Sequence, residues 1–295
     1  ASAIPRREGV DRFSYVPGAS PNGGMWDAGV PFCLPGDQRP DEALAVNYTS
    51  APLAEDRILL GRPRLRATVS SDVSVIPLAA RLCDVSPDGT SVLVTRGILN
   101  LTRRHGTERG EPLPLDTPVE MDLELEAAAW QFRAGHRLRL SVNGSDFPNV
   151  WPTPYVGEVR LHTAEPAVLE LPWWTASEPL PFQFLPSDSP MAGTGATDDT
   201  PAWRVVHDVL EDRLRFVMAN GNEFVVSNLR PAEAWTCATS RTAAEWPGLR
   251  VRSEASAALT SDRESFHLVL TLNVWVNDVP HAQRRWQQSV RRDWM

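Results

Sequence analysis

The chain has 295 residues, a formal net charge of −8 and a hydrophobic content of 42%. A chain of this length can bury about three quarters of its unfolded surface as one unit, so it needs no disulfide or metal for stability. The acidic balance argues against a nucleic-acid partner, which would require a basic stripe to contact phosphates. All 29 basic residues are arginine, and the absence of lysine excludes Schiff-base lysines, Ser-Lys dyads and Walker-type phosphate loops.

The three cysteines, Cys33, Cys83 and Cys237, are widely spaced and match neither a disulfide framework nor a zinc motif. We therefore expect a reducing environment, cytoplasmic rather than secreted. No run of about 18 apolar residues occurs, and the first 30 residues lack the apolar core of a signal peptide. The sequence thus predicts no membrane span and no membrane partner. The first residue is Ala1 rather than methionine, which suggests a processed product or a piece of a longer chain.

Residues 1–41 are rich in proline and glycine, and we expect an irregular lead-in there. After it, apolar and polar residues alternate with the period of two that is typical of half-buried strands. The clearest cases are "VEMDLELE" (119–126) and "HRLRLSV" (136–142), which we expect to pair through the connection at 127–135 so that an acidic face meets a basic one. Further strands are predicted, in chain order, at 44–50, 64–70, 76–85, 91–99, 158–162, 167–171, 204–209, 214–217, 223–226, 249–253 and 265–275.

Helical periodicity is weak throughout the chain. "LAEDRILL" (53–60) and the closing "PHAQRRWQQSVRRDW" are predicted to be at most short helices or turns. "SPDG" (86–89) and "ANGN" (219–222) predict hairpin turns, because proline presets φ and Asn-Gly supplies a positive φ. Many short strands together with 26 prolines predict an all-β sandwich or barrel with few short helices.

Two long loops are expected, at 102–117 and 186–201. The second could mark a domain boundary, but both of its flanks are rich in predicted strands. The part after it is too short for an independent sandwich. We therefore expect a single domain over 42–295 with a long surface loop.

The stretch "FRAGHRLRLSVNGSDFPN" carries His136, Ser145 and Asp146 within eleven positions, and these residue types suit a nucleophilic site. A strand that starts at His136 carries the histidine away from the other two, so the three do not predict a compact triad. We expect a strand and a turn instead. In that turn Asn143, Ser145 and Asp146 would bond to backbone groups, and Pro148 would end the strand.

"GASPNG" (18–23) formally matches the GxSxxG pattern around hydrolase nucleophiles. That chemistry needs a strand before the serine and a helix after it, whereas Pro17 and Pro21 flank Ser20, so we expect a polar loop. No catalytic residue is predicted from spacing. The histidines share no HxH or HExxH spacing, and we predict no metal site and no cofactor. They are His105, His136, His162, His207, His267 and His281.

Eleven tryptophans are a high number, and Trp130, Trp151, Trp173 and Trp174 flank predicted strand ends. Aromatic residues near the loops of a sandwich can bind sugars by stacking, yet large aromatic side chains also fill the core of a large sandwich. We favour packing or a domain interface. Carbohydrate or ligand binding is the alternative.

Three segments in order carry a family resemblance: "LAVNYTSAPLAEDRILLGRPRLRATVSSD", "LAARLCDVSPDGTSVLVTRGILN" and "FRAGHRLRLSVNGSDFPNVWPTP". They resemble the C-terminal jelly-roll domain of the Xaa-Pro dipeptidyl-peptidase and cocaine-esterase type (CocE/NonD) serine hydrolases. The resemblance implies a jelly-roll β-sandwich, similar to galactose-binding domains, that packs against an α/β-hydrolase domain of the same parent chain. That hydrolase domain would hold the serine, aspartate and histidine of catalysis.

The resemblance further implies that this chain is a non-catalytic accessory domain, which stabilises the hydrolase domain and helps to shape its substrate cleft. Phe147, Pro148 and Trp151 would lie at the domain interface or in the cleft wall. The parent would cleave an ester or an Xaa-Pro peptide. Two alternatives remain open from the residues: an autonomous carbohydrate- or ligand-binding module, and a hydrolase that uses Ser20. A homo-oligomer is also left open.

Overall fold

The computed structural model describes residues 9–24, 36–164, 167–175, 203–218 and 222–295. These residues form β-strands almost throughout, with one short helix, α1 (Arg39–Glu42), and brief 3₁₀ turns, among them Leu101–Arg103. The all-β prediction is therefore confirmed. In the described residues, no helix is long and apolar enough to cross a bilayer.

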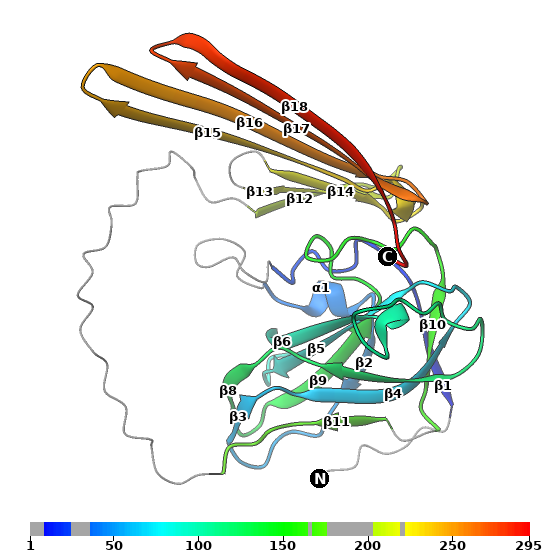
Figure 1. The fold of residues 1–295 in the computed structure, drawn as a ribbon. Coiled ribbons are helices and arrows are strands. Elements are labelled where there is room, and N and C mark those ends of the chain that lie inside the picture. The colour runs from blue at the N-terminus through cyan, green and yellow to red at the C-terminus, as the bar shows by residue number, and fades with distance from the viewer. Residues whose placement is uncertain (1–8, 25–35, 165–166, 176–202, 219–221) are drawn as a thin grey trace.

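The described residues between 9 and 175 form a sandwich of antiparallel sheets (Figure 1). One sheet has the order β1 (Val10–Ser14), β10 (Glu158–His162), β4 (Arg64–Ser71), β11 (Val168–Glu170), with β7 (Val119–Glu124) also paired to β4. The second has the order β2 (Val46–Thr49), β9 (Arg137–Asn143), β5 (Pro77–Val85), β6 (Ser91–Asn100). A two-stranded sheet joins β3 (Arg57–Gly61) to β8 (Ala128–Phe132).

The core lies between these sheets. Strand β5 is buried at all nine positions, because it pairs with β6 on one side and β9 on the other and is covered on both faces. The alternating strands contribute one face each, as period-two patterning requires. Among the fully enclosed apolar side chains of this core are Leu59, Val69, Ile76, Leu78, Leu82, Leu101, Leu125, Phe132 and Val159.

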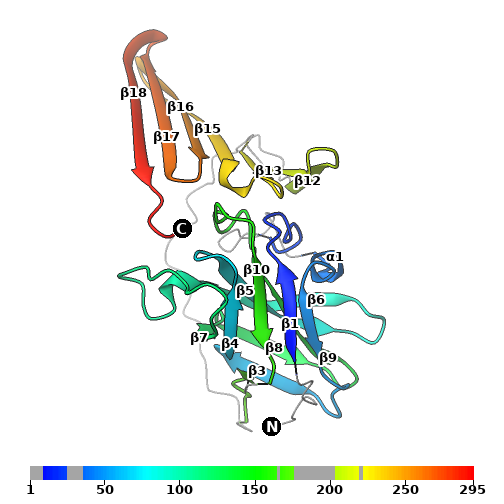
Figure 2. The same ribbon diagram turned by 90° about the vertical axis from the view of Figure 1, so that its right-hand side faces the viewer.

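The strands after residue 202 form a second structural layer. They are consecutive in one seven-stranded antiparallel sheet and pair only among themselves. Its strands are β12 (Trp203–Asp208), β13 (Arg213–Met218), β14 (Glu223–Ser227), β15 (Trp235–Trp246), β16 (Leu249–Ser261), β17 (Ser265–Val276) and β18 (Val279–Arg291). The last four are long, and their two hairpins project away from the sandwich (Figure 2). We call β15–β18 the arm.

That residues 42–295 form a single domain remains a prediction. Because the strands after residue 202 pair only with one another, a boundary between two domains would fall before residue 203. The loop expected at 186–201 lies outside the described residues. The loop expected at 102–117 contains no strand. The expected lead-in, by contrast, contains β1, which pairs with β10 over five residues. A five-residue strand ahead of a Pro/Gly-rich stretch leaves only a weak periodic signal.

The expected pairing of 119–126 with 136–142 is wrong. β7 pairs with β4, and β9 pairs with β2 and β5, because the connection between them holds β8 and crosses to other neighbours. The acidic face of β7 still meets arginines: Asp122 accepts from Arg64 at 2.5 Å and from Arg66 at 3.3 Å.

Two segments predicted as short helices or turns are strands. "LAEDRILL" contributes to β3, and the closing segment forms the thirteen-residue β18. Each segment forms backbone hydrogen bonds to a neighbouring strand, β3 to β8 and β18 to β17. These pairings outweigh a weak local propensity. The hairpin prediction at 86–89 is confirmed, since Gly89 (φ +87°) closes the turn between β5 and β6. β13 and β14 also pair as a hairpin, with positions 219–221 of its turn outside the described residues.

Candidate functional site

The structure separates His136 from Ser145 and Asp146, the three residues that the stretch 132–149 places close together in sequence. The Nδ1 atom of His136 lies 2.8 Å from Asp84 Oδ1, at the start of β9. Ser145 and Asp146 lie in the turn after β9, so the seven-residue strand separates them from His136. Asn143 Oδ1 accepts from the Ser145 amide at 3.2 Å, and the Ser145 hydroxyl accepts from the Phe147 amide at 3.3 Å. Asn143 and Ser145 thus bond to backbone amides as expected, and no triad forms from these three residues. The carboxylate of Asp146 instead bonds to side chains, and the strand already ends at Asn143, before Pro148.

Asp146 is the centre of a buried ionic cluster. Its side chain is only 2% exposed, and its Oδ1 atom accepts from Arg81 Nη2 at 3.2 Å and from Arg96 Nη1 at 3.3 Å. Asn149 Nδ2 donates to its other oxygen at 3.1 Å. Arg96 also donates to the Gly23 carbonyl at 2.7 Å. A buried charge requires a partner of opposite sign, so this cluster fixes the turn after β9 against β5 and β6.

Helix α1 places two further carboxylates in the same region. Asp41 is 1% exposed, and it accepts from the Asn22 side-chain amide at 2.7 Å and from the Asn22 backbone N–H at 3.1 Å. Glu42 is 5% exposed and accepts from Arg139 Nη1 at 2.6 Å and from the Ser91 hydroxyl at 2.5 Å. Burial raises the pKa of Asp41 to about 6, despite the opposing bonds from Asn22.

Ser20 is part of this network and has no catalytic geometry. It is 2% exposed, its hydroxyl donates to the Ser145 carbonyl at 2.6 Å, and it accepts from Arg81 Nη2. A serine nucleophile must be accessible and must bond to a general base. Here both bonds of the hydroxyl go to structural partners, of which one is a permanently charged arginine. The prediction of a polar loop at "GASPNG" agrees with this arrangement.

The Asp84–His136 pair has a structural use. Trp130 Nε1 donates to Asp84 Oδ2 at 2.9 Å, so one carboxylate joins the histidine of β9 to the indole of β8. The side chains of His136 and Asp84 are 22% and 8% exposed. The pair ties β8 and the start of β9 to the end of β5. A carboxylate that orients a histidine is also found in catalytic triads. Here, however, the hydroxyls of Ser20 and Ser145 bond to other partners than His136.

Phe147 and Trp151 join the sandwich to the C-terminal sheet. Phe147 is 1% exposed and makes edge-to-face contacts with Phe216, Phe224 and Trp151, at centroid distances of 5.4, 6.3 and 6.4 Å. Trp151 packs edge-to-face on Phe266 at 5.9 Å. The peptide bond between Phe147 and Pro148 is cis. The residues expected at a domain interface therefore contact the sheet of this same chain; their contact with a hydrolase domain stays a prediction.

Two more contacts hold the C-terminal sheet in place. The Gly18 amide donates to Asn228 Oδ1 at 2.9 Å. At the chain's end, the Trp294 carbonyl accepts from Asn100 Nδ2 at 2.7 Å and from the Thr102 hydroxyl at 3.1 Å. Arg292 also donates to the Pro152 carbonyl. The closing segment thus crosses back to the sandwich, which sequence reasoning missed because its partners lie between 140 and 194 positions away.

The tryptophans near the strand ends are used in packing. Trp130 bonds to Asp84, Trp151 packs against the second sheet, and Trp173 makes an edge-to-face contact with Phe132 at 6.0 Å. Indoles held in this way are not free to stack on a sugar, so the carbohydrate-binding alternative is not favoured.

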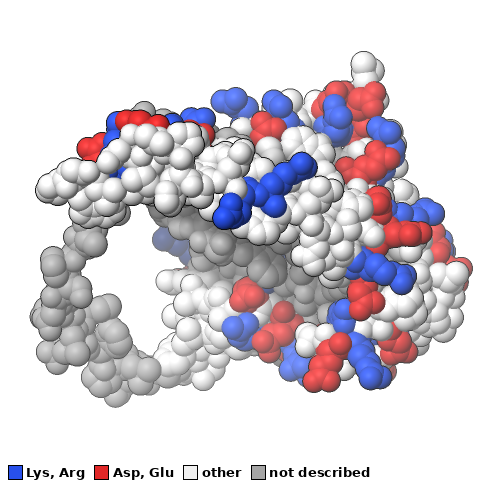
Figure 3. Space-filling view, turned by 45° about the horizontal axis from the view of Figure 1, so that its top comes forward, with Lys and Arg blue, Asp and Glu red and all other residues white. Residues whose placement is uncertain are grey.

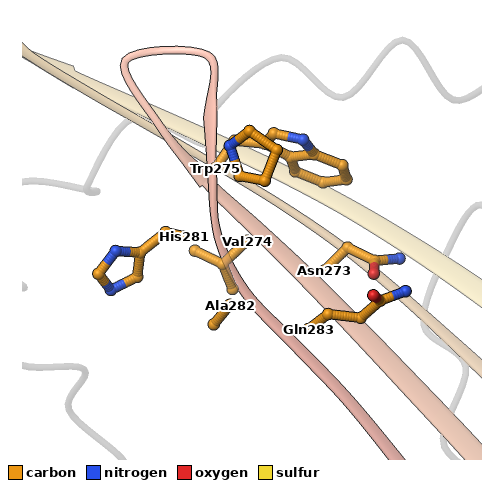
Figure 4. A pocket seen from close by; sticks show the side chains of 7 residues that line it. Asn273, Val274, Trp275, His281, Ala282 and Gln283 are labelled. Atoms are coloured by element: carbon orange, nitrogen blue, oxygen red, sulfur yellow. The ribbon is translucent and has the colours of Figure 1, made fainter.

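Over the described ranges, no group of three or more His, Cys, Asp or Glu residues is arranged to hold a metal ion. Cys83 and Cys237 are free thiols, and burial raises the pKa of Cys83 to about 12; Cys33 lies outside the described residues. Two hollows, of about 340 and 320 Å³, lie on the arm rather than on the sandwich. Figure 4 shows the first, where Asn273 lies beside Gln283 and Val274 beside Ala282.

The described residues thus form a β-sandwich in which Ser20 is buried against Arg81 and the carboxylate of Asp146 is paired with two arginines. Comparisons with known proteins identify the family of this sandwich. Residues 8–178 match the family described as X-Pro dipeptidyl-peptidase C-terminal non-catalytic domain. This match covers more than half of the chain, so the protein belongs to that family. The arm and the rest of the C-terminal sheet lie beyond the matched residues.

Curated relatives are esterases. The chain is 28% identical over 116 residues to a cocaine esterase from Rhodococcus sp. (strain MB1 Bresler), covering 39% of this chain and 20% of the relative. It is 24% identical over 155 residues to the putative serine esterase Mb1866c from Mycobacterium bovis, covering 45% and 24%. This chain thus spans about a fifth to a quarter of the curated relatives that it matches.

A solved structure supports the fold. An aminopeptidase from the marine sediment archaeon Thaumarchaeota archaeon superimposes with a TM-score of 0.51 at 20% identity, covering 57% of this chain and 34% of that one. At 20% sequence identity, this similarity is evidence for a shared fold and for nothing more.

Proposed function

We propose that this chain is the accessory β-sandwich of a serine hydrolase that cleaves an acyl bond, either an ester or an Xaa-Pro peptide. The observation that carries the proposal is the family match over residues 8–178, to a domain described as non-catalytic. The esterase names of the curated relatives support the reaction class. The buried Ser20 hydroxyl, held by Arg81 and the Ser145 carbonyl, argues against Ser20 as a nucleophile.

In this proposal the partner is an α/β-hydrolase domain of the same protein, which supplies the serine, histidine and aspartate. The sandwich stabilises that domain and walls one side of its substrate cleft. Rigid packing suits this role: the cluster around Asp146 fixes the loop edge of the sandwich, and Phe147 fixes the sheet above it. Pro148 and Trp151, which are only partly buried, remain candidates for contact with the hydrolase domain.

Active-site labelling of the native protein tests the proposal. The protein that carries these 295 residues is recovered with an antibody raised against the chain and treated with a fluorophosphonate probe. Hydrolysis of p-nitrophenyl butyrate and of Gly-Pro-p-nitroanilide is measured in parallel. We expect labelling of a peptide outside the 295 residues, and no labelling of the recombinant chain. Labelling of Ser20, abolished by Ser20→Ala, would overturn the proposal, as would recovery of a protein with no fluorophosphonate-reactive serine.

A further inference from the structure

The last strand of the arm, β18, has a long backbone edge that no other described strand pairs with. The seven-stranded sheet ends at β18, which bonds to β17 on one side only (Figure 2). Every residue of β18 except Ala282 is exposed. The opposite edge of the sheet, β12, has six residues, whereas β18 has thirteen. A free edge of this length can pair with another extended chain.

The register shows which backbone groups of β18 point away from the sheet. The Arg292 amide donates to the Glu264 carbonyl at 2.8 Å, in register with the pairing of β17 and β18. In an antiparallel ladder, residues that bond to the neighbouring strand alternate with residues that do not. The even positions from 282 to 290 therefore bond to β17. The odd positions from 283 to 291 direct their N–H and C=O groups outward.

The side chains along this edge are basic. The strand carries three exposed arginines, Arg284, Arg285 and Arg291. Neither β17 nor β18 contains an aspartate or a glutamate, so no carboxylate lies beside these arginines in the two strands. The guanidinium of Arg284 reaches the backbone carbonyl of Gln283 at 2.9 Å instead. In the space-filling view, a run of basic side chains stands on a broad uncharged area, whereas both signs of charge are interspersed over much of the remaining surface (Figure 3).

Between the arginines, β18 exposes apolar side chains on one face. Trp286 and Val290 are each 50% exposed. Directly paired residues lie on the same side of an antiparallel sheet, and Val290 pairs with Phe266, which contacts Trp151 of the sandwich. This face therefore turns toward the sandwich at the base of the arm. A strand added beyond β18 could place its own apolar side chains next to Trp286 and Val290.

Charge complementarity identifies the occupant of this edge as an acidic extended segment. Carboxylates opposite the arginines would form charge-assisted pairs, and the outward backbone groups would bond to the main chain of the added strand. A second copy of β18 does not fit, because it would bring further arginines and no carboxylate to the same edge. Every pairing within the arm is antiparallel, and we expect the added strand to follow that pattern.

We propose that β18 binds an acidic extended segment of another protein as an eighth, antiparallel strand of this sheet. The register defines the pattern of that segment when its first residue lies opposite Arg291. Acidic residues then occupy positions 1, 7 and 8, opposite Arg291, Arg285 and Arg284. Apolar residues occupy positions 2 and 6, opposite Val290 and Trp286, with a third at position 4 between them. This proposal does not depend on the proposed hydrolase.

Binding of designed peptides to the 295-residue chain tests the proposal. The probe is the fluorescein-labelled peptide EVTVTVEE, which has the required pattern, and its control RVTVTVRR carries basic residues at the acidic positions. Fluorescence anisotropy is measured at low ionic strength, because salt screens exposed charges. We expect saturable binding of EVTVTVEE and none of RVTVTVRR. Hydrogen exchange measured by mass spectrometry should slow over residues 283–291 when EVTVTVEE is bound.

Two variants separate the contribution of the charges from that of the backbone edge. The triple variant Arg284→Gln, Arg285→Gln, Arg291→Gln removes the charges, and its control Arg204→Gln makes the same change on β12 at the other edge. Gln287→Pro removes an outward N–H and keeps the bonds to β17, and Gln287→Ala is its control. We expect the triple variant and Gln287→Pro to bind EVTVTVEE at least about tenfold more weakly than the wild type, and the controls to bind as the wild type does. Circular dichroism verifies that each variant is folded.

The outcomes that overturn the proposal are distinct. Absence of saturable EVTVTVEE binding at about 200 µM chain overturns it, as does equal binding of RVTVTVRR. If Gln287→Pro binds as tightly as the wild type, or if a DNA duplex binds as tightly as the peptide, the arginines attract anions in general and strand addition is wrong. Slower hydrogen exchange on β12 alone would place the peptide at the other edge and would also overturn the proposal.

Discussion

The indole nitrogen of Trp151 donates a hydrogen bond to the hydroxyl of Ser261 at 3.0 Å, joining residues that are 110 positions apart. Trp151 comes from the sandwich and Ser261 from the end of β16. Because Phe147 also packs on Phe216, this corner of the sandwich sets the position of the whole C-terminal sheet. The contact connects the family-matched sandwich to a sheet that lies beyond the matched residues.

Substitution of Trp151 is expected to loosen the C-terminal sheet. Trp151→Phe loses the hydrogen bond and should lower the free energy of unfolding by about 1 kcal/mol. Trp151→Ala also loses the contacts with Phe266 and Phe147, and should cost about 2–3 kcal/mol for this partly buried ring. Urea denaturation monitored by circular dichroism measures both values. Equal effects of the two variants would show that ring packing contributes nothing.

Removal of the Asp146 carboxylate is expected to be among the most destabilising single changes in the sandwich. Asp146→Ala leaves the buried guanidinium groups of Arg81 and Arg96 without their shared anion, at a cost of about 3–5 kcal/mol. Glu170→Ala breaks the exposed pair with Arg66 and should cost under about 1 kcal/mol. Chemical denaturation of both variants provides the comparison. A loss for Asp146→Ala as small as that for Glu170→Ala would refute a structural role for the cluster.

Asp41 should make the folded state less stable as the pH rises. Burial raises its pKa from 3.8 to about 6, so the folded chain holds this proton more tightly than the unfolded chain does. The resulting contribution is fully present below pH 4 and is lost as the pH rises through 6. Its size is about 2–3 kcal/mol from the difference in pKa.

Asp41→Asn removes this contribution and keeps a side-chain oxygen for the bonds from Asn22. We expect the difference in unfolding free energy, variant minus wild type, to increase by about 2–3 kcal/mol between pH 4 and pH 7. Denaturation at several pH values measures this difference directly, because the other titrating groups cancel. A difference that is constant over this range would mean that Asp41 titrates normally.

Gly144 is expected to tolerate no side chain. An added Cβ would lie 2.6 Å from Cδ2 of the Tyr15 ring, and that ring is 3% exposed and cannot move aside. Gly144→Ala should therefore cost about 1–3 kcal/mol through overpacking. Gly9→Ala is the matched control, since its added Cβ meets nothing within 4 Å. Melting temperatures of the two variants report the effect, and equal values would contradict it.

The alternation of apolar and polar residues, together with turn-forming residues, located most of the strands from the sequence. Alternation and apolar runs in the sequence located β4, β5, β7, β9 and β17, but only β7 alternates in burial, whereas β5 is buried at every position. The "SPDG" turn was equally readable, because Gly89 adopts a positive φ. The all-β class and the family resemblance followed from such local signals. So did the conclusion that "GASPNG" is a polar loop, because its flanking prolines exclude the strand–turn–helix geometry of a nucleophile.

Only the tertiary structure decided which strands pair and which polar residues meet. β7 and β9 lie close in sequence but have different neighbours, and Asp146 finds its partners Arg81 and Arg96 from 65 and 50 positions away. The placement of Phe147 against Phe216 is likewise a long-range outcome. Alternation along one strand specifies which face is buried, but not which distant segment covers it. That choice depends on the packing and charge complementarity of the whole chain.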